Sequence, residues 1–322
     1  MSTKTDTSAQ KMILFTLTSA RSGTLYLREL FRHNVRGCVS RHEPFFDWGN
    51  PTLFGRVIFE VHAGRRDRIR KLLAKKQAYI ERTNGSVYLE SSHAFLKSAY
   101  VAAMEYFPEM RLIHLIRDPM KVAKSEEWRI GWRQRLHAPF HFYVGDDGKK
   151  HFAWGLTGTE QIFRSLGEMQ LSLFQWCLVQ WIEIENRAMR FLDENGSQER
   201  CFTLHCPRDL NDPDKLKVMF AFFGVETFES EVRLGGRRNK SLGTMTVITE
   251  KDEAECDAVI EKLPASYLRI FEREPYAGEL WSERLKPVSV PATNARAQPL
   301  VFPSVHAARD SRYQRPGTEC RS

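Results

Sequence analysis

The sequence has no long hydrophobic run and no regular pattern of cysteines. No apolar segment reaches the roughly 18 residues that a transmembrane helix needs, and the polar start, MSTKTDTSAQ, lacks the basic-then-apolar order of a signal peptide. The six cysteines form no CxxC pair, and no histidines follow them at zinc-finger spacing. These absences favour a cytoplasmic protein that has no membrane span, no disulfide framework and no structural metal.

The net charge is positive, and the basic residues are spread along the chain instead of clustering in one segment. A net charge of +8 favours an anionic partner, and the spread of lysine and arginine along the chain suits a small polyanion better than a nucleic acid. With 322 residues, 42% of them hydrophobic, the chain can bury one large core, so we expect a single domain. Oligomeric state is left open by the sequence.

Buried strands alternate with helices along the chain, which predicts an α/β fold with a central, mainly parallel β-sheet flanked by helices. Each expected strand is a short apolar run bounded by polar residues, and each expected helix has apolar residues at helical spacing. The expected strands are residues 12–17, 86–92, 111–116 and 200–206; the expected helices begin at 24, 94 and 119, cover 171–191, and end at Gly224.

Composition divides the chain into four parts. Residues 1–10 are expected to form a flexible N-terminus and residues 11–285 the folded domain. Within that domain, residues 134–167 are rich in glycine and aromatic residues without a sustained period, which indicates an ordered insertion or a lid. From residue 286 to 322 the chain is rich in proline, alanine, serine and arginine, and we expect an extended or partly disordered tail.

The first strand is followed by the loop TSARSGT, which has the character of an anion-binding loop. At a helix N-terminus the backbone amides of Ser22, Gly23 and Thr24 point outward and carry partial positive charge. Ser22 and Thr24 add hydroxyl groups, and Arg21 adds a fork-shaped cation. The pattern GxxxxGK[ST] is absent, and the strand RLIHLIRDP ends in Arg117, which is a phosphate ligand and not a metal ligand. A Mg²⁺ site is therefore not expected.

Two motifs together resemble a known family. TSARSGTLYL resembles the 5′-phosphosulfate loop of the P-loop sulfotransferases, which use 3′-phosphoadenosine 5′-phosphosulfate (PAPS), and LIHLIRDPMKVAKS resembles their 3′-phosphate motif. In that family the strand ends in an arginine, and a serine follows eight positions later on the next helix, as Arg117 and Ser125 do here. Less specifically, GGRRNKS resembles the late basic loop that closes over the nucleotide.

The resemblance implies a P-loop NTPase-like sulfotransferase fold that takes PAPS as its co-substrate without a metal ion. The 5′-phosphosulfate would then be held by Arg21, Ser22, Gly23 and Thr24, and Arg21 would also act on the charge that develops in the reaction. The 3′-phosphate would be held by Arg117 and Ser125. The closing loop would contribute Arg238, Asn239 and Lys240, for which a solvated turn is the alternative.

The transfer of a sulfuryl group also needs a base that takes the proton of the acceptor. Glu43, in SRHEPFFDW, resembles the catalytic glutamate of carbohydrate sulfotransferases, and His93, in YLESSHAF, resembles the catalytic histidine of cytosolic ones. Glu43 is the preferred candidate, and His42 is a further one. The structural alternatives are an ion pair between Glu43 and a neighbouring arginine, and a helix-capping role for His93.

The expected function is transfer of a sulfuryl group from PAPS to a hydroxyl or amine of an acceptor, which we expect to be a small molecule or a carbohydrate. One alternative is an ATP-dependent small-molecule kinase with a degenerate P-loop, and another is a non-catalytic protein that keeps the nucleotide-binding fold. The identity of the acceptor is beyond what the sequence reveals, because specificity resides in variable loops such as residues 134–167.

Overall fold

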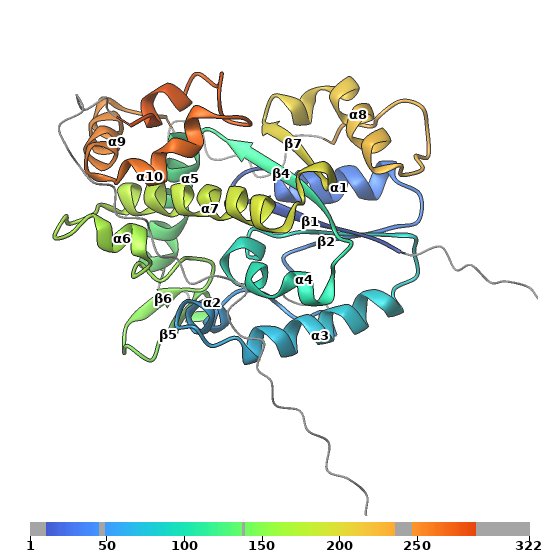
Figure 1. Ribbon diagram of the computed structural model, residues 1–322, viewed down its shortest axis with the longest axis horizontal. Helices are drawn as coiled ribbons and strands as arrows, with labels where there is room; N and C mark the ends of the chain where they lie inside the picture. Colours follow the sequence, from blue (N-terminus) through green and yellow to red (C-terminus); the bar gives the residue numbers. More distant parts are fainter. Residues whose placement is uncertain (1–10, 45–48, 137–138, 236–246, 288–322) are drawn as a thin grey trace, which may run out of the picture. The chain divides into compact units, whose positions relative to one another are not determined.

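A five-stranded parallel sheet forms the centre of the computed structural model, which describes residues 11–44, 49–136, 139–235 and 247–287 (Figure 1). All four strand pairs are parallel, and the order across the sheet is β2-β3-β1-β4-β7. The predicted α/β fold with a central parallel sheet is therefore confirmed. The strands are β1 (Met12–Thr18), β2 (Cys38–His42), β3 (Val87–Ser91), β4 (Arg111–Arg117) and β7 (Cys201–Cys206).

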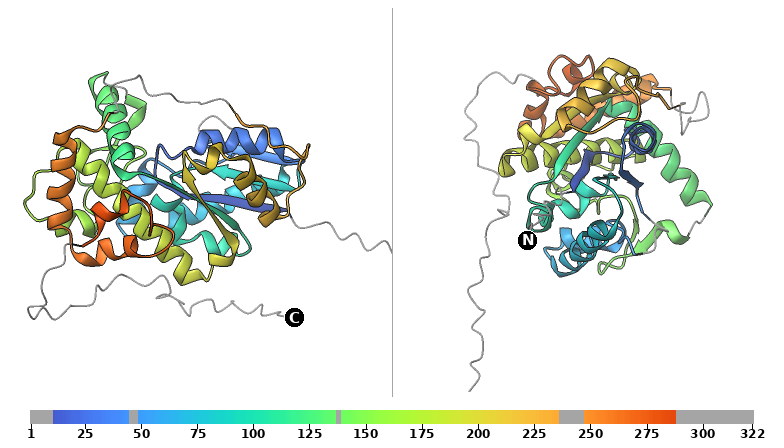
Figure 2. Two further views of the ribbon diagram at one scale, coloured as in Figure 1. Left: turned by 90° about the horizontal axis from the view of Figure 1, so that it is seen from above. Right: turned by 90° about the vertical axis from the view of Figure 1, so that its right-hand side faces the viewer.

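Helices cover both faces of this sheet, as the views in Figures 1 and 2 show. Successive side chains along a strand point to opposite faces of the sheet, so Leu14 and Phe15 enter two different hydrophobic clusters. One cluster includes α1 (Thr24–Asn34) and α8 (Pro213–Phe223), and the other includes α7 (Leu173–Asn195). The remaining helices are α2 (Arg56–His62), α3 (Asp67–Arg82), α4 (Ala103–Tyr106), α5 (Pro119–Arg135), α6 (Gln161–Ser165), α9 (Glu250–Lys262) and α10 (Ala265–Leu268).

The helix expected to begin at residue 94 is not continuous, so that prediction is wrong. Its place is taken by two 3₁₀ turns, η1 (Phe95–Lys97) and η2 (Ala99–Val101), and the short α4. Ser98, between the turns, has φ −139°, and its hydroxyl donates to the backbone carbonyl of Leu53. Tertiary hydrogen bonding has overridden a sequence of good helix formers here.

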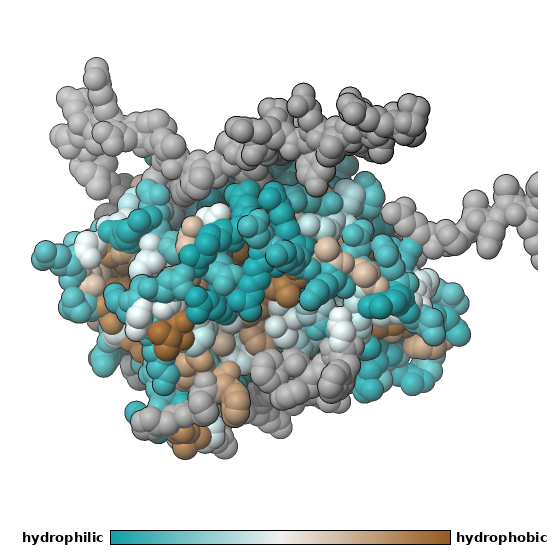
Figure 3. Space-filling view, turned by 90° about the horizontal axis from the view of Figure 1, so that it is seen from below, coloured by the Kyte–Doolittle hydropathy of each residue, from teal (hydrophilic) through white to brown (hydrophobic). Residues whose placement is uncertain are grey.

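Residues 134–167 are folded where the structure describes them. They contain the 3₁₀ turn η3 (Pro139–His141), the antiparallel hairpin of β5 (Phe142–Val144) and β6 (Lys150–Phe152), and α6. The expected N-terminal segment and nearly all of the expected tail, by contrast, lie outside the described residues. No described helix is long and apolar enough to cross a membrane. The face shown in Figure 3 is mainly hydrophilic, with separate hydrophobic patches.

Candidate functional site

The carboxyl ends of four neighbouring strands lie along one edge of the sheet. The parallel register places the last residue of β2 beside the last residue of β3, with His42 opposite Ser91. Residues that directly follow these strands therefore gather at this edge, where ligands of open α/β sheets bind. The residues brought there are Arg21 after β1, Glu43 after β2, His93 after β3 and Arg117 at the end of β4.

The loop after β1 has the backbone expected of an anion-binding turn. Gly23 has φ 94° and Arg21 has φ 63°, so the chain bends sharply into α1. No side chain caps the N-terminus of α1, so its backbone amides have no side-chain acceptor among the described residues. Ser22 and Thr24 are both buried. The loop therefore has uncapped backbone amides at the carboxyl edge of the sheet.

Both the backbone conformation and the lack of room for a side chain require glycine at position 23. A Cβ atom there would lie 2.6 Å from Leu210 Cδ1 and 3.0 Å from Cys206 Sγ. We expect Gly23→Ala to lower the free energy of unfolding by about 2–4 kcal/mol, since left-handed strain and overpacking act together. Gly64→Ala is the matched control, because Gly64 has φ 80° and no described atom within 4 Å of a Cβ. Equal losses for the two variants in urea unfolding would contradict the packing argument.

The junction between β4 and α5 contacts this loop directly. Asp118 caps α5 by accepting from the amides two and three residues later, at 3.0 and 3.2 Å, and Pro119 occupies the first helical position. Arg117 Nη1 donates to the carbonyl of Arg21 at 2.6 Å, and Arg21 Nε donates to Ser125 Oγ at 2.8 Å. The two junctions therefore form one corner of the sheet edge.

Glu43 and His93, which the sequence offers as rival bases, lie in contact. Glu43 Oε1 is 2.8 Å from His93 Nε2, and His93 Nδ1 is 3.0 Å from Lys97 Nζ. The Lys97 ammonium also donates to the backbone carbonyl of Trp154. Because an ammonium can only donate, Nδ1 accepts and the imidazole proton resides on Nε2, facing Glu43. This contact places one carboxylate beside His93 at the carboxyl edge of the sheet.

The charges of this group follow from its burial and its neighbours. Burial and the positive charge of Lys97 lower the pKa of His93, which favours a neutral imidazole at neutral pH. Burial would raise the pKa of Glu43, but His93, His42 and Arg129 together hold it well below its ordinary value. Glu43 is therefore ionised at neutral pH, and its lowered pKa makes it a weaker base than an ordinary glutamate.

Burial also lowers the pKa of Lys97 to about 8, despite the opposing charge of Glu126. Between this value and the ordinary value of about 10.4, the unfolded chain binds a proton that the folded chain does not. Stability due to Lys97 should therefore rise with pH across that window. In urea unfolding, the free-energy difference between wild type and Lys97→Met should shift by roughly 2–3 kcal/mol in favour of wild type from about pH 7 to about pH 10. A difference independent of pH would contradict this.

The remaining residues expected at the site are placed differently. His42 Nδ1 lies 2.7 Å from the carbonyl of Ser91 and must donate to it, so this nitrogen is engaged by the neighbouring strand. Arg238, Asn239 and Lys240 lie outside the described residues.

Four charged residues at this edge were missed by the sequence analysis. Glu126 and Lys97 are buried, and the side chains of Arg129 and Arg133 are mostly covered. Arg129 Nη2 contacts Glu126 Oε2 at 2.8 Å. A signal was present, since Arg129 and Arg133 follow Ser125 at intervals of four on one helix face. Without the position of the insertion, that spacing cannot be told from a solvated helix face.

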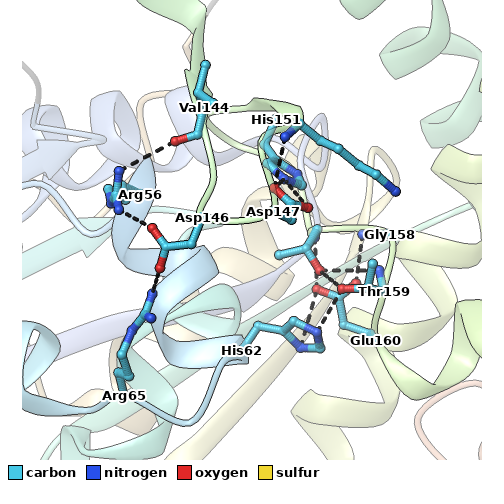
Figure 4. A network of polar contacts seen from close by, with 12 residues as sticks. Arg56, His62, Arg65, Val144, Asp146, Asp147, His151, Gly158, Thr159 and Glu160 are labelled. Atoms are coloured by element: carbon cyan, nitrogen blue, oxygen red, sulfur yellow. Dashed lines mark hydrogen bonds and ion pairs between the residues drawn. The ribbon is translucent and has the colours of Figure 1, made fainter.

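The insertion is fixed to α2 and to the turn that follows it by the polar contacts drawn in Figure 4. Asp146, in the turn of the β5–β6 hairpin, contacts Arg56 and Arg65, the latter at 2.6 Å. Thr159 Oγ1 lies 2.9 Å from His62 Nε2 at the end of the same helix. Among the described residues, no group of three or more His, Cys, Asp or Glu side chains could hold a metal ion.

No protein-family model matches the sequence, and no curated protein matches it. Solved structures with similar backbones include a sulfotransferase from Alicyclobacillus acidocaldarius, with a TM-score of 0.44 and 17% identity over 81% of this chain and 94% of that one. A sulfotransferase domain from the curacin biosynthetic pathway has a TM-score of 0.42 and 14% identity over 86% and 97% of the two chains. A sulfotransferase domain from the olefin synthase of Synechococcus PCC 7002 has a TM-score of 0.36 and 14% identity over 91% and 94%.

Proposed function

We propose that this chain is a sulfotransferase that moves the sulfuryl group of PAPS to a hydroxyl or amine of a small-molecule or carbohydrate acceptor. The observation that carries the proposal is the corner in which Arg21 Nε donates to Ser125 Oγ and Arg117 Nη1 donates to the carbonyl of Arg21. A nucleotide with phosphates at both ends of its ribose needs two neighbouring anion sites, and the contacts between the two junctions support the proposal because they bring the donors of both together.

The residues present fit such a ligand. Arg117 Nε is buried and has no hydrogen-bond partner within the described part of the chain. The amides at the start of α1 lack a side-chain cap there as well. A phosphate would satisfy both sets of donors, which would otherwise be costly to leave unpaired. In the proposal Arg21, Ser22, Gly23 and Thr24 hold the 5′-phosphosulfate, and Arg117 and Ser125 hold the 3′-phosphate; on sequence grounds alone Arg238, Asn239 and Lys240 close over the nucleotide.

The transfer then proceeds by in-line displacement. The acceptor oxygen or nitrogen forms a bond to sulfur as the bond between sulfur and the phosphate oxygen breaks. Glu43 takes the acceptor proton, and His93, held by Lys97, orients the Glu43 carboxylate. The guanidinium of Arg21 stabilises the negative charge that develops on the departing phosphate.

Nucleotide binding tests this proposal against the kinase alternative. The purified protein in EDTA should bind 3′-phosphoadenosine 5′-phosphate (PAP) in calorimetry and be stabilised by it in thermal unfolding. Transfer from radiolabelled PAPS to a panel of phenols, amines and sugars should then identify an acceptor class. Stabilisation by ATP with Mg²⁺ and none by PAP would overturn the proposal. Binding of PAP without transfer to any acceptor would favour the non-catalytic alternative.

A further inference from the structure

One face of α5 carries two arginines beyond the proposed nucleotide site. Ser125, Arg129 and Arg133 follow one another at intervals of four residues. At a rise of about 1.5 Å per residue, Arg129 lies about 6 Å and Arg133 about 12 Å along the helix from Ser125. The backbone of Arg133 therefore lies beyond the proposed 3′-phosphate site along the helix.

The insertion supplies an aromatic wall against these two guanidinium groups. Arg129 lies 5.5 Å from the ring centre of Phe152, and Arg133 lies 5.9 Å from the same ring and 5.7 Å from that of Trp154. The imidazole of His141 packs on Trp154 with ring centres 5.4 Å apart. Two arginines and a histidine thus share one partly covered site between α5 and the insertion.

The polar atoms of this group are incompletely satisfied. Arg129 Nε, Arg133 Nη1 and His141 Nδ1 are buried, and none has a hydrogen-bond partner among the residues that the structure describes. Within the described part of the chain, the ion pair of Glu126 is with Arg129, and no ion pair of Arg133 is found there. Burial is the largest cause that lowers the pKa of Arg133 to about 10, and repulsion from Arg129 is the next largest. An anion would satisfy all three groups.

We propose that Arg133, with Arg129 and His141, forms a subsite for an anionic group of the acceptor. This inference rests on the proposed function: the acceptor is then a hydroxy compound that already carries a carboxylate or phosphate, with an apolar portion against Phe152 and Trp154. The subsite selects the acceptor, while Arg21, Arg117 and Ser125 serve the donor. Glu43 and Arg21 both lie near enough for their charges to affect the pKa of Arg133, so the subsite adjoins the proposed reaction site.

Arg133→Met is the informative variant because methionine keeps an apolar stem against the aromatic wall. The matched control is Arg70→Met, which removes an exposed arginine paired with Glu105 on the surface. Circular dichroism and thermal unfolding should show that both variants fold. Arg133→Lys, which keeps the charge but loses the fork, should have an intermediate effect.

The acceptor test compares para-hydroxybenzoate, para-hydroxyphenylpropanoate and para-hydroxyphenyl phosphate with the corresponding neutral amides and phenol. For wild type and Arg70→Met, we expect at least one anion to exceed its neutral partner by about 10- to 100-fold in kcat/KM, as for a charged hydrogen bond. For Arg133→Met this ratio should fall to within about threefold, with PAP affinity unchanged. The carboxylate and phosphate arms show which anion is preferred.

Saturation-transfer NMR detects binding of the same probes in the absence of nucleotide, and this measurement separates the two proposals. If PAP does not bind but the anions bind in preference to their neutral partners, and Arg133→Met loses this preference, the subsite stands and the sulfotransferase proposal fails. If no anion is bound or turned over in preference to its neutral partner, the subsite is wrong. It is also wrong if Arg133→Met weakens PAP as strongly as it weakens the anions, because the arginines then serve the donor.

Discussion

Glu43→Gln should lower kcat for sulfuryl transfer by about 10²- to 10⁴-fold, the range associated with loss of a general base. Glutamine keeps the shape of the side chain and can still accept at the position that lies 2.8 Å from His93 Nε2. Donor binding should persist, because the contacts of Arg21, Arg117 and Ser125 do not involve Glu43. Rates at saturating PAPS, together with PAP calorimetry, measure these two effects separately.

His93 variants show which member of the pair takes the proton. In the structure both nitrogens of His93 face a neighbour, Lys97 on one side and Glu43 on the other. We therefore treat His93 as a positioning residue and expect His93→Gln to cost less in kcat than Glu43→Gln. The opposite order, with Glu43→Gln active and His93→Gln inactive, would make His93 the base.

The pH dependence gives an independent check. Against the opposing effect of burial, the neighbouring His93, His42 and Arg129 hold the pKa of Glu43 well below its ordinary range, so Glu43 stays ionised in mildly acidic solution. The wild-type kcat/KM, which reports the free protein, should stay level from about pH 7 down to about pH 5. A fall centred near the ordinary histidine pKa of about 6.5 would contradict Glu43 as the base.

Backbone conformation singles out Arg21 and Glu43. Among the residues that the structure describes, Arg21 with φ 63° and Glu43 with φ 40° are the non-glycine residues in the left-handed region. This conformation costs of order 1–3 kcal/mol and persists only where surrounding structure imposes it. The left-handed conformation of these two residues turns the chain sharply after β1 and again after β2, so that both side chains reach the carboxyl edge of the sheet. The strain is therefore consistent with a functional role for both residues.

The two junctions that form the proposed nucleotide site could be predicted because their signals are local. MILFTL followed by SARSGT specifies a buried strand, a turn and a helix within a dozen or so residues. RDP specifies the end of β4, the Asp118 cap and the first residue of α5 in three consecutive letters. The neighbouring positions of β1 and β4 then bring the two junctions together.

The pairing of Glu43 with His93 could not be predicted in this way. It depends on the register of β2 against β3, in which His42 lies opposite Ser91, and no local pattern encodes that register. Lys97 lies in the first of the two 3₁₀ turns that replace the expected helix. The role of Arg133 likewise depends on an insertion whose aromatic residues have no periodic pattern. Long-range contacts decide the pairing of Glu43 with His93 and the surroundings of Arg133.

Arg117→Ala should weaken PAP binding by about 10- to 100-fold, as expected when a buried charged hydrogen bond is lost. Arg117 both supports the loop through the carbonyl of Arg21 and leaves Nε without a partner in the described structure, so its removal affects both halves of the proposed nucleotide site.

The matched control for this variant is Arg111→Ala, at the opposite end of the same strand. Arg111 Nη1 donates to the carbonyl of Phe223 at 2.7 Å, far along β4 from the carboxyl edge. Arg111→Ala should therefore lower stability and leave the PAP dissociation constant within about twofold of wild type, since no group at the site is removed. Calorimetry on both variants decides the matter. If Arg117→Ala binds PAP as wild type does, the end of β4 holds no phosphate and the two junctions do not form a nucleotide site.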